Sequence, residues 1–373
     1  MNRTADVIVV GAGVIGLAVA YELSRRGARV RVLEARGAGE GASQASAGML
    51  TPHTDISDQP PLWRLGARSL DLYDGFLECL REDGGAGVEY RRCGSLHVAA
   101  TEAQTEDLRR MADRLGALNI ACEVLGAAGV RELEPQIDDE MVGGLLVPGH
   151  GYVAAGDLVR AMCAAVATRG VRLDGDRVLR IGAQASGLRI ETQGETIQAP
   201  AVVVAAGSWT SRVVVEGDQV LPVRPVRGQL VHLDWPTAPL GRIVWGPECY
   251  LVPWTTGALL VGATVEEAGF DERATTAGVR DLLEAACDLL PRAWQAGFSG
   301  VRVGLRPATP DGLPVIGASR RVAGVYYATG HYRNGVLLAP VTALLVADLV
   351  LGQPPDSALD AFRADRFGPL TKP

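Results

Sequence analysis

Three glycines near the N-terminus have a spacing that suits the binding of a dinucleotide. Gly11, Gly13 and Gly16 form the pattern G-x-G-x-x-G, and the acidic residue Glu34 follows them. The first glycine permits a tight turn, the second lets backbone approach a pyrophosphate, and the third lets a helix lie close to a sheet. A carboxylate at Glu34 accepts hydrogen bonds from an adenosine ribose and repels a 2′-phosphate. FAD or NAD therefore fits the pattern, and NADP does not.

The glycine pattern is informative only inside a βαβ unit, because a chain with 46 glycines can match it by chance. Residues 6–10 are apolar and β-branched, which is typical of a buried parallel strand. A helix is expected over about 14–26, ended by Gly27, and a second strand over 30–33. The N-terminal amides of this helix then face the phosphates. Strand, glycines, helix, strand and acid together predict a dinucleotide site.

Two arginines have positions that suit the binding of a carboxylate. Arg306 lies in GLRPATPDG and Arg333 in GHYRNG, both in glycine-rich turns after apolar strands. A guanidinium holds a carboxylate by two parallel hydrogen bonds and keeps its charge when it is partly buried. The plain alternative is that both are surface arginines, because the chain contains many arginines. Nearly all of its basic residues are arginines, and Lys372 is the only lysine. The scarcity of lysine argues against pyridoxal phosphate chemistry.

The composition is that of an ordinary globular protein. The chain has 373 residues, a mass of 39.2 kDa and a net charge of −7. This length predicts two domains, and the negative charge argues against nucleic acid or an anionic membrane as partner. Six scattered cysteines and five histidines show no metal-ligand spacing, so we expect no metal site. The apolar run 336–351 is too short to span a membrane and is expected to form a buried core helix. Because the N-terminus also runs directly into the first strand, we expect a cytoplasmic protein.

The later strands predict a divided nucleotide-binding domain. Residues 201–207 (AVVVAAG) form a second apolar strand ending in glycine, where α/β folds bind ligands. The fold class is therefore α/β, with a doubly wound, Rossmann-like domain and a second, β-sheet-rich substrate domain. The predicted ranges are 1–85, 150–218 and 304–373 for the first domain, and 86–149 and 219–303 for the second.

Other segments predict elements of the second domain. Residues 90–99 suggest a strand and its turn, and 124–151 are loop-rich. A hairpin is expected from strands 250–253 and 258–262 around WTTG. A helix is expected over 276–290, with Thr276 as a candidate N-cap.

Motifs spread over the whole chain carry a family resemblance. Beside the N-terminal pattern they include GASQASAGML, VVVAAGSWT, VRPVRGQL and GLRPATPDGLPVIG, and the most specific are GHYRNGVLLAP and CYLVP. By these motifs the chain resembles the D-amino-acid oxidase/glycine oxidase family of FAD-dependent amine oxidases, and within it the glycine oxidases of thiamine biosynthesis. The resemblance implies FAD as the cofactor.

The resemblance implies roles for matching residues. Arg306 would pair with the substrate carboxylate, Tyr250 would assist through its hydroxyl, and Arg333 would lie close to the same carboxylate. These three are the expected catalytic residues. The glycine pattern, the small-residue loop 36–50, the end of the 201–207 strand and the family motifs together predict the cofactor contacts. These are Gly11, Gly13, Val14, Ile15, Gly16, Glu34, Ala35, Ser43, Ser46, Ala47, Gly48, Met49, Val178, Ala206, Gly207, Trp209, Gly330, His331, Arg333, Asn334, Gly335 and Val336.

The residues expected to border the substrate space are Met49, Glu248 and Val265, and the chain departs from the family pattern at two positions. Glu248 stands where a glycine oxidase carries histidine, which changes the polarity of the expected pocket entrance. Gly304 stands where related sarcosine oxidases attach flavin through a cysteine. FAD is therefore expected to bind non-covalently.

The activity implied by the resemblance is oxidative deamination of glycine, a small D-amino acid or a secondary amine. The products are a 2-oxo acid such as glyoxylate, ammonia or an amine, and hydrogen peroxide, with oxygen as electron acceptor. A homo-oligomer is expected by analogy. Three alternatives stay open: a dehydrogenase of the same fold that passes electrons to a quinone or another acceptor, an NAD-dependent dehydrogenase, and a flavin-binding subunit inactive alone.

Overall fold

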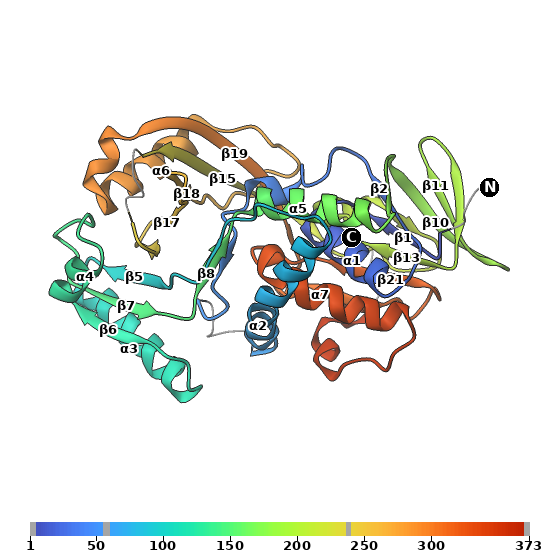
Figure 1. Cartoon of the computed structure of the whole chain (residues 1–373), viewed down its shortest axis with the longest axis horizontal. Coiled ribbons are helices and arrows are strands. Elements are labelled where there is room, and N and C mark those ends of the chain that lie inside the picture. The colour runs from blue at the N-terminus through green and yellow to red at the C-terminus, as the bar shows by residue number, and fades with distance from the viewer. Residues whose placement is uncertain (1–4, 55–59, 236–239, 369–373) are drawn as a thin grey trace.

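The computed structural model describes residues 5–54, 60–235 and 240–368. Figure 1 shows two halves, with a largely parallel sheet and its helices in one and a larger mixed sheet in the other. The long strands β15 (Arg224–Asp234) and β19 (Gly297–Ala308) reach from the second half toward the first. Among the described residues, no helix has both the length and the apolarity needed to cross a membrane.

The N-terminal βαβ unit has almost the predicted bounds. It consists of β1 (Val7–Val10), α1 (Val14–Arg25) and β2 (Val30–Glu34). Gly27 follows α1 with a φ of +89°, and the amide of Ala28 donates to the carbonyl of Leu23 at 3.1 Å. This left-handed closure is the helix end that a glycine at this position predicts.

A six-stranded sheet is built from segments far apart in the chain. Its order is β20-β21-β13-β1-β2-β9, in which β9 is Arg172–Gly175, β13 Ala201–Val204, β20 Val315–Ala318 and β21 Val325–Thr329. β1 pairs in parallel with β13, with Val7 opposite Ala201, and β13 pairs in parallel with β21. Only the edge strand β20 runs antiparallel. The doubly wound α/β fold class is confirmed.

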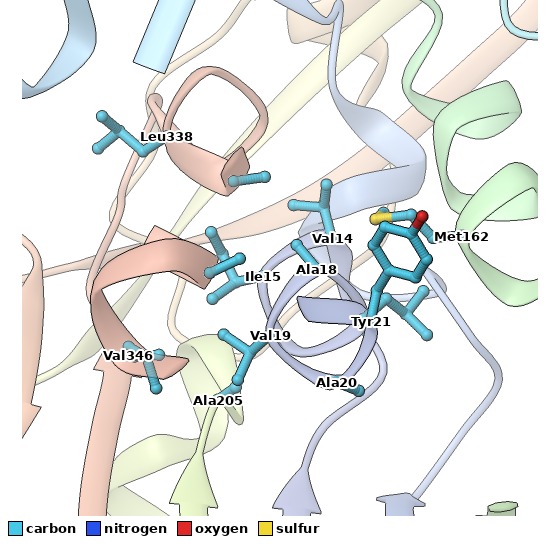
Figure 2. Packing of buried hydrophobic residues seen from close by; sticks show 14 of the residues in the cluster. Val14, Ile15, Ala18, Val19, Ala20, Tyr21, Met162, Ala205, Leu338 and Val346 are labelled. Carbon is cyan, nitrogen blue, oxygen red and sulfur yellow. The ribbon is translucent and has the colours of Figure 1, made fainter. Parts of the chain in front are cut away.

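Apolar layers cover both faces of this sheet. On one face α1 packs against α5 (Ala155–Thr168) and α7 (Gly335–Val350), and α7 also contacts α2 (Pro60–Glu82). Figure 2 shows α1 side chains between Met162 of α5 and Leu338 and Val346 of α7. The other face packs on a four-stranded sheet of β10 (Val178–Gln184), β11 (Gly187–Thr192), β12 (Thr196–Ala199) and β14 (Val214–Val215). Burial on both faces explains the unbroken apolar runs in β1 and β13.

The second half is organised by an eight-stranded sheet. Its order is β19-β15-β18-β17-β16-β5-β7-β6, with β5 Ser95–Ala99, β6 Glu123–Gly126, β7 Gly143–Val147, β16 Ile243–Trp245, β17 Tyr250–Pro253 and β18 Ala258–Gly262. The predicted hairpin of β17 and β18 is confirmed with its bounds. One face packs on α6 (Thr276–Leu289) and α4 (Ala127–Leu133). The other face lies toward residues of the first half, including Ala47 and Tyr152.

Three element predictions for the second half are corrected. Residues 124–151, expected to be loop-rich, consist largely of α4 and strands β6 and β7, because their apolar side chains pack in the core of this half. Residues 90–99 form β4 (Tyr90–Arg91) and β5, which lie in different sheets; β4 joins β8 (Gly151–Val153) and β3 (Met49–Leu50). The N-cap of α6 is Thr275, whose hydroxyl accepts from the amide of Gly278 at 3.2 Å.

The remaining elements are α3 (Glu102–Ala117), whose N-terminus has a capping box at Thr101, and several short 3₁₀ turns. Two of these turns border the site described below: η1 (Ala42–Ala45) and η2 (Gly207–Arg212). The two-domain division stays a prediction, and its boundary at 303/304 falls within β19.

Candidate functional site

A cleft opens beyond the carboxyl ends of β1, β2 and β13. Its walls come from the first βαβ unit, the η1 and η2 turns, the start of β10 and the turn before α7. Ligands of α/β folds bind at this edge of the sheet. The predicted cofactor residues that line the cleft are Gly11, Gly13, Val14, Ile15, Glu34, Ala35, Ser43, Ser46, Val178, Ala206, Gly207, Trp209, His331, Arg333, Gly335 and Val336.

The three glycines have different steric surroundings. Gly11 has a φ of +105°, and a Cβ there would lie 2.5 Å from the Ala205 carbonyl oxygen. A Cβ on Gly16 would lie 1.9 Å from the Gly11 carbonyl oxygen, so α1 can approach β1 only with glycine here. A Cβ on Gly13 would meet only the Ser43 hydroxyl, at 3.5 Å. The space above Gly13 is therefore open toward the cleft, as phosphate binding requires.

Polar groups beside the glycine turn, at the start of α1 and at the end of β2, suit the binding of an adenosine diphosphate. The Ser43 hydroxyl accepts from the amide of Val14, in the first turn of α1, at 3.0 Å. The Glu34 carboxylate accepts from the amide of Ala12 at 2.7 Å and from the amide of Arg36 at 2.9 Å. Glu34 thus lies at the end of β2 with its oxygens fixed beside the cleft. Helix amides near phosphate and a carboxylate near ribose are the groups that FAD needs, so the residues present fit this cofactor.

Gly13→Ala is expected to lower the affinity for FAD by about tenfold or more while leaving the fold intact, because the added methyl group occupies the open space without a clash inside the protein. Flavin titration of the cofactor-free protein measures the affinity, and thermal unfolding of the same sample measures the fold. Gly75→Ala is a matched control, since a Cβ at Gly75 meets nothing within 4 Å. Unchanged FAD affinity in Gly13→Ala would contradict the placement of the phosphates at this turn.

The other end of the cleft is formed by the turn that leads into α7. Tyr332 has a φ of +49°, and its amide donates to the Pro307 carbonyl at 3.0 Å. His331 is buried, and burial lowers its pKa to about 3, so its ring is neutral at physiological pH. Its Nε2 lies 3.1 Å from the Thr342 hydroxyl. The turn therefore offers backbone, a neutral ring and the N-terminus of α7 to a bound ring system.

Six predicted cofactor residues do not line the cleft. Gly16 packs inside the βαβ unit, and Gly48, with a φ of +71°, packs against the Val153 carbonyl. Gly330, with a φ of +75°, packs against Thr309. Ala47, Met49 and Asn334 are the others. Their contacts with the cofactor stay predictions, whereas the glycines have a steric role in shaping the turns around the cleft.

Arg306 is positioned by two strands of the eight-stranded sheet. It lies within β19, opposite Val226 of β15, and not in the glycine-rich turn that the sequence predicted, because β19 continues to Ala308 in register with β15. Its Nη1 donates to the carbonyls of Thr264 at 2.8 Å and Arg227 at 3.3 Å. A Cβ on Gly228 would lie 2.3 Å from the Arg306 guanidinium, so this glycine provides the room for the charged group. Among the described residues Arg306 makes no ion pair with a carboxylate. Burial lowers its pKa, and an anionic ligand would compensate the charge.

Tyr250 lies on the same face of the sheet as Arg306. It starts β17 opposite Gly262, where a Cβ would lie 2.3 Å from the tyrosine hydroxyl, so Gly262 makes room for the ring. Trp245 packs against it, with the ring centroids 5.1 Å apart. Burial raises the pKa of Tyr250, while the nearby charges of Arg306 and Arg333 oppose this rise. The hydroxyl stays protonated at neutral pH and can donate a hydrogen bond.

The expected substrate-space residues are dispersed. Met49 is half-buried and packs in the apolar cluster that contains Tyr250. Glu248 is exposed in the turn between β16 and β17, and Val265 is 52% exposed after β18. Their roles stay predictions. At Gly304 a Cβ would lie 2.8 Å from the Ala45 methyl group, so a cysteine at this position would displace η1.

Sequence reasoning missed several residues of the cleft wall. Arg36, Arg212 and Tyr332 line the cleft, as do Asp176 and Ser208. Arg36 had a usable signal, because it follows Glu34 at the carboxyl end of a parallel strand, where α/β ligands bind. The sequence offered no such signal for Arg212, because Arg212 is one arginine among many.

Comparisons with known proteins agree with this geometry over nearly the whole chain. The DAO family, described as FAD dependent oxidoreductase, matches residues 6–349. The glycine oxidase of Geobacillus kaustophilus is 38% identical over 94% of both chains. The crystal structure of glycine oxidase from Geobacillus kaustophilus matches with a TM-score of 0.93, covering 97% of this chain and 99% of that one at 37% identity. The bifunctional protein ThiO/ThiG of Trichormus variabilis is 35% identical over 98% of this chain, which spans 55% of that longer protein. The chain therefore belongs to the DAO family of FAD-dependent oxidoreductases.

Proposed function

We propose that the protein catalyses the oxidative deamination of glycine or a similarly small amino acid. In the reaction, glycine, oxygen and water give glyoxylate, ammonia and hydrogen peroxide. Bound FAD supplies the acceptor for the two electrons and the hydrogen that leave the α-carbon. The residues of the chain bind the carboxylate, orient the α-carbon and exclude water from the site.

The observation that carries the proposal is the Arg306 guanidinium without a carboxylate partner among the described residues. Its hydrogen bonds go to backbone carbonyls, and the nearby Glu266 is engaged by Arg227 at 2.6 Å. A half-buried guanidinium that is bonded only to carbonyls favours an anionic ligand, and its geometry matches the two oxygens of a carboxylate.

Two further side chains place polar groups near the Arg306 guanidinium. Tyr250 contributes a protonated hydroxyl that can donate to the same carboxylate, and Arg333 adds a second positive charge at the cleft. The residues Leu305 and Pro307, on either side of Arg306, line the cleft itself. A carboxylate held by Arg306 therefore lies beside the cofactor cleft, and the α-carbon is oriented by this attachment. The proposal requires no general base that acts on the α-carbon.

The relatives support glycine as the first substrate to test, because relatives that the chain matches over nearly their whole length are named glycine oxidase. A place in thiamine biosynthesis is supported by the similarity to ThiO/ThiG proteins. Non-covalent attachment of FAD is supported by the close packing of Gly304 against Ala45. Oxygen as acceptor, a cytoplasmic location and a homo-oligomer remain parts of the proposal.

The visible spectrum of the purified protein tests this function. Glycine, sarcosine and D-alanine are added in turn under anaerobic conditions, and air is then admitted. Bleaching of the flavin band by glycine, with recovery and peroxide formation in air, is the expected result. Bleaching without recovery in air would favour a dehydrogenase that uses a quinone or another acceptor. A flavin band that none of the three compounds changes would overturn the proposed substrate class.

A further inference from the structure

Residues 263–275, between β18 and α6, reach from the eight-stranded sheet to the outer wall of the FAD cleft. Phe270 of this segment lies against Trp209, with ring centroids 5.8 Å apart. The Arg212 guanidinium lies over the Phe270 ring, 3.6 Å from its centroid. Trp209 and Arg212 both line the cleft. Phe270, which does not itself line the cleft, therefore contacts two residues that do.

A second contact joins the same segment to a different part of the wall. Glu272 pairs with Arg36, with Nη1 to oxygen distances of 2.9 and 3.0 Å. Arg36 follows Glu34 and lies over the Trp209 ring at 5.2 Å. The contacts of Phe270 and Glu272 therefore reach the same group of cleft residues. Arg36 of this group follows β2, and Trp209 and Arg212 follow β13. Arg36 and Arg212 are exposed. The ion pair with Glu272 restricts the Arg36 side chain, and the contact with the Phe270 ring restricts the Arg212 side chain.

The segment is itself held firmly by β15. Arg227 pairs with Glu266 at 2.6 Å and with Asp271 at 3.2 Å. The fully buried Gln229 donates to the Thr275 hydroxyl at 2.8 Å and accepts from the Thr275 amide at 2.9 Å. Both ends of the segment are therefore fixed to the sheet that carries the substrate-side residues.

We propose that Phe270 and Glu272 hold the outer wall of the cleft in place and slow the release of FAD. Arg36 and Arg212 line the cleft and are exposed to solvent, and the 263–275 segment contacts both of them and Trp209. This inference rests on FAD as the cofactor, not on the proposed substrate. Because the segment also carries the Thr264 carbonyl that holds Arg306, cofactor retention and the carboxylate site share one structural support.

The test measures FAD release from the holoenzyme without any amino acid, so its outcome is separate from that of the substrate assignment. The purified protein is diluted, and the rise of free-flavin fluorescence gives the release rate. Phe270→Ala is expected to raise the rate by about tenfold, because it removes the ring contacts with Trp209 and Arg212. Glu272→Gln is expected to raise it by about threefold, and added salt should bring the wild type toward the rate of this variant.

Glu267→Gln is the matched control, because Glu267 lies in the same segment but pairs with Arg224, which does not line the cleft. Its release rate is expected to equal that of the wild type. Wild-type rates in both Phe270→Ala and Glu272→Gln would overturn the proposal, and so would an equal acceleration in Glu267→Gln and Glu272→Gln. If Phe270→Ala does not fold, the comparison of the two glutamate variants decides.

Discussion

Arg306→Ala is expected to lower kcat/KM for glycine by about a thousandfold, because removal of one partner from a desolvated charge pair costs on the order of 4 kcal/mol. FAD should remain bound, since Arg306 does not line the cofactor cleft. The 263–275 segment stays attached to β15 through the Arg227–Glu266 pair and the Gln229–Thr275 hydrogen bonds. Steady-state kinetics with glycine measures the first effect. The flavin content of the purified variant measures the second.

Two variants make this result specific to the guanidinium. Arg306→Lys keeps the charge but loses the paired hydrogen bonds, so an intermediate loss of kcat/KM is expected. Arg302→Ala is the control, because Arg302 lies on the same strand and face but donates to the Gln44 carbonyl at 3.1 Å. Near-wild-type kinetics in Arg306→Ala would remove this residue from the substrate site, and loss of flavin would assign it to the cofactor.

Acidification is expected to destabilise the fold already between pH 6.5 and 4, before most carboxylates titrate. All five histidines have lowered pKa values, chiefly because of burial. Burial lowers the pKa of His97 and His232 to about 4 and that of His331 to about 3. The pKa of His53 is lowered by burial against the opposing charge of Asp71, and that of His150 by burial and by neighbouring basic groups. In this pH range the unfolded chain binds protons that the folded chain excludes. Stability is therefore complete above pH 6.5 and falls as the pH decreases toward the folded-state values.

The expected loss of unfolding free energy by pH 4 is on the order of 10 kcal/mol, since the pKa values of His97, His232 and His331 lie at least 2.5 units below the unfolded value of 6.5 and each pKa unit contributes about 1.4 kcal/mol. Urea unfolding of the holoenzyme at pH 7, 6, 5 and 4 measures it. His97→Phe, which removes one of the buried rings that must take up a proton, should flatten the pH dependence. A stability that stays constant down to pH 4.5 would contradict the prediction.

Each element that was predicted correctly is indicated by a pattern within a short stretch of sequence. The βαβ unit has its glycines, its apolar strands and the helix-ending Gly27 within one segment, and the hairpin 250–262 has a turn between two largely apolar runs. The final helix was identified from its apolar run. In each case local conformation and burial favour the same structure, so the sequence alone suffices.

What could not be predicted depends on pairings between distant segments. No local pattern says that β9 lies beside β2, or that β5 pairs in parallel with β16. The same holds in the site: Gly228 and Gly262 make room for Arg306 and Tyr250 across strands, and such a role is visible only in three dimensions. Arg306 was singled out by its glycine-rich surroundings after an apolar run, and the family resemblance then gave it the role of carboxylate partner. Tyr250 was identified through the resemblance alone, because it has no distinctive local pattern.

The order of the six-stranded sheet constrains how the protein acquires its cofactor during synthesis. β1 has a neighbour, β13, that is translated almost two hundred residues later, and β13 in turn needs β21. The cleft walls include Gly13, Gly207 and His331, so no FAD site exists until the chain has left the ribosome nearly to its end. Such distant pairings are slow to form. The nascent chain must therefore keep its first apolar strand protected while the intervening segments are made, and flavin can assist only the last stage of folding.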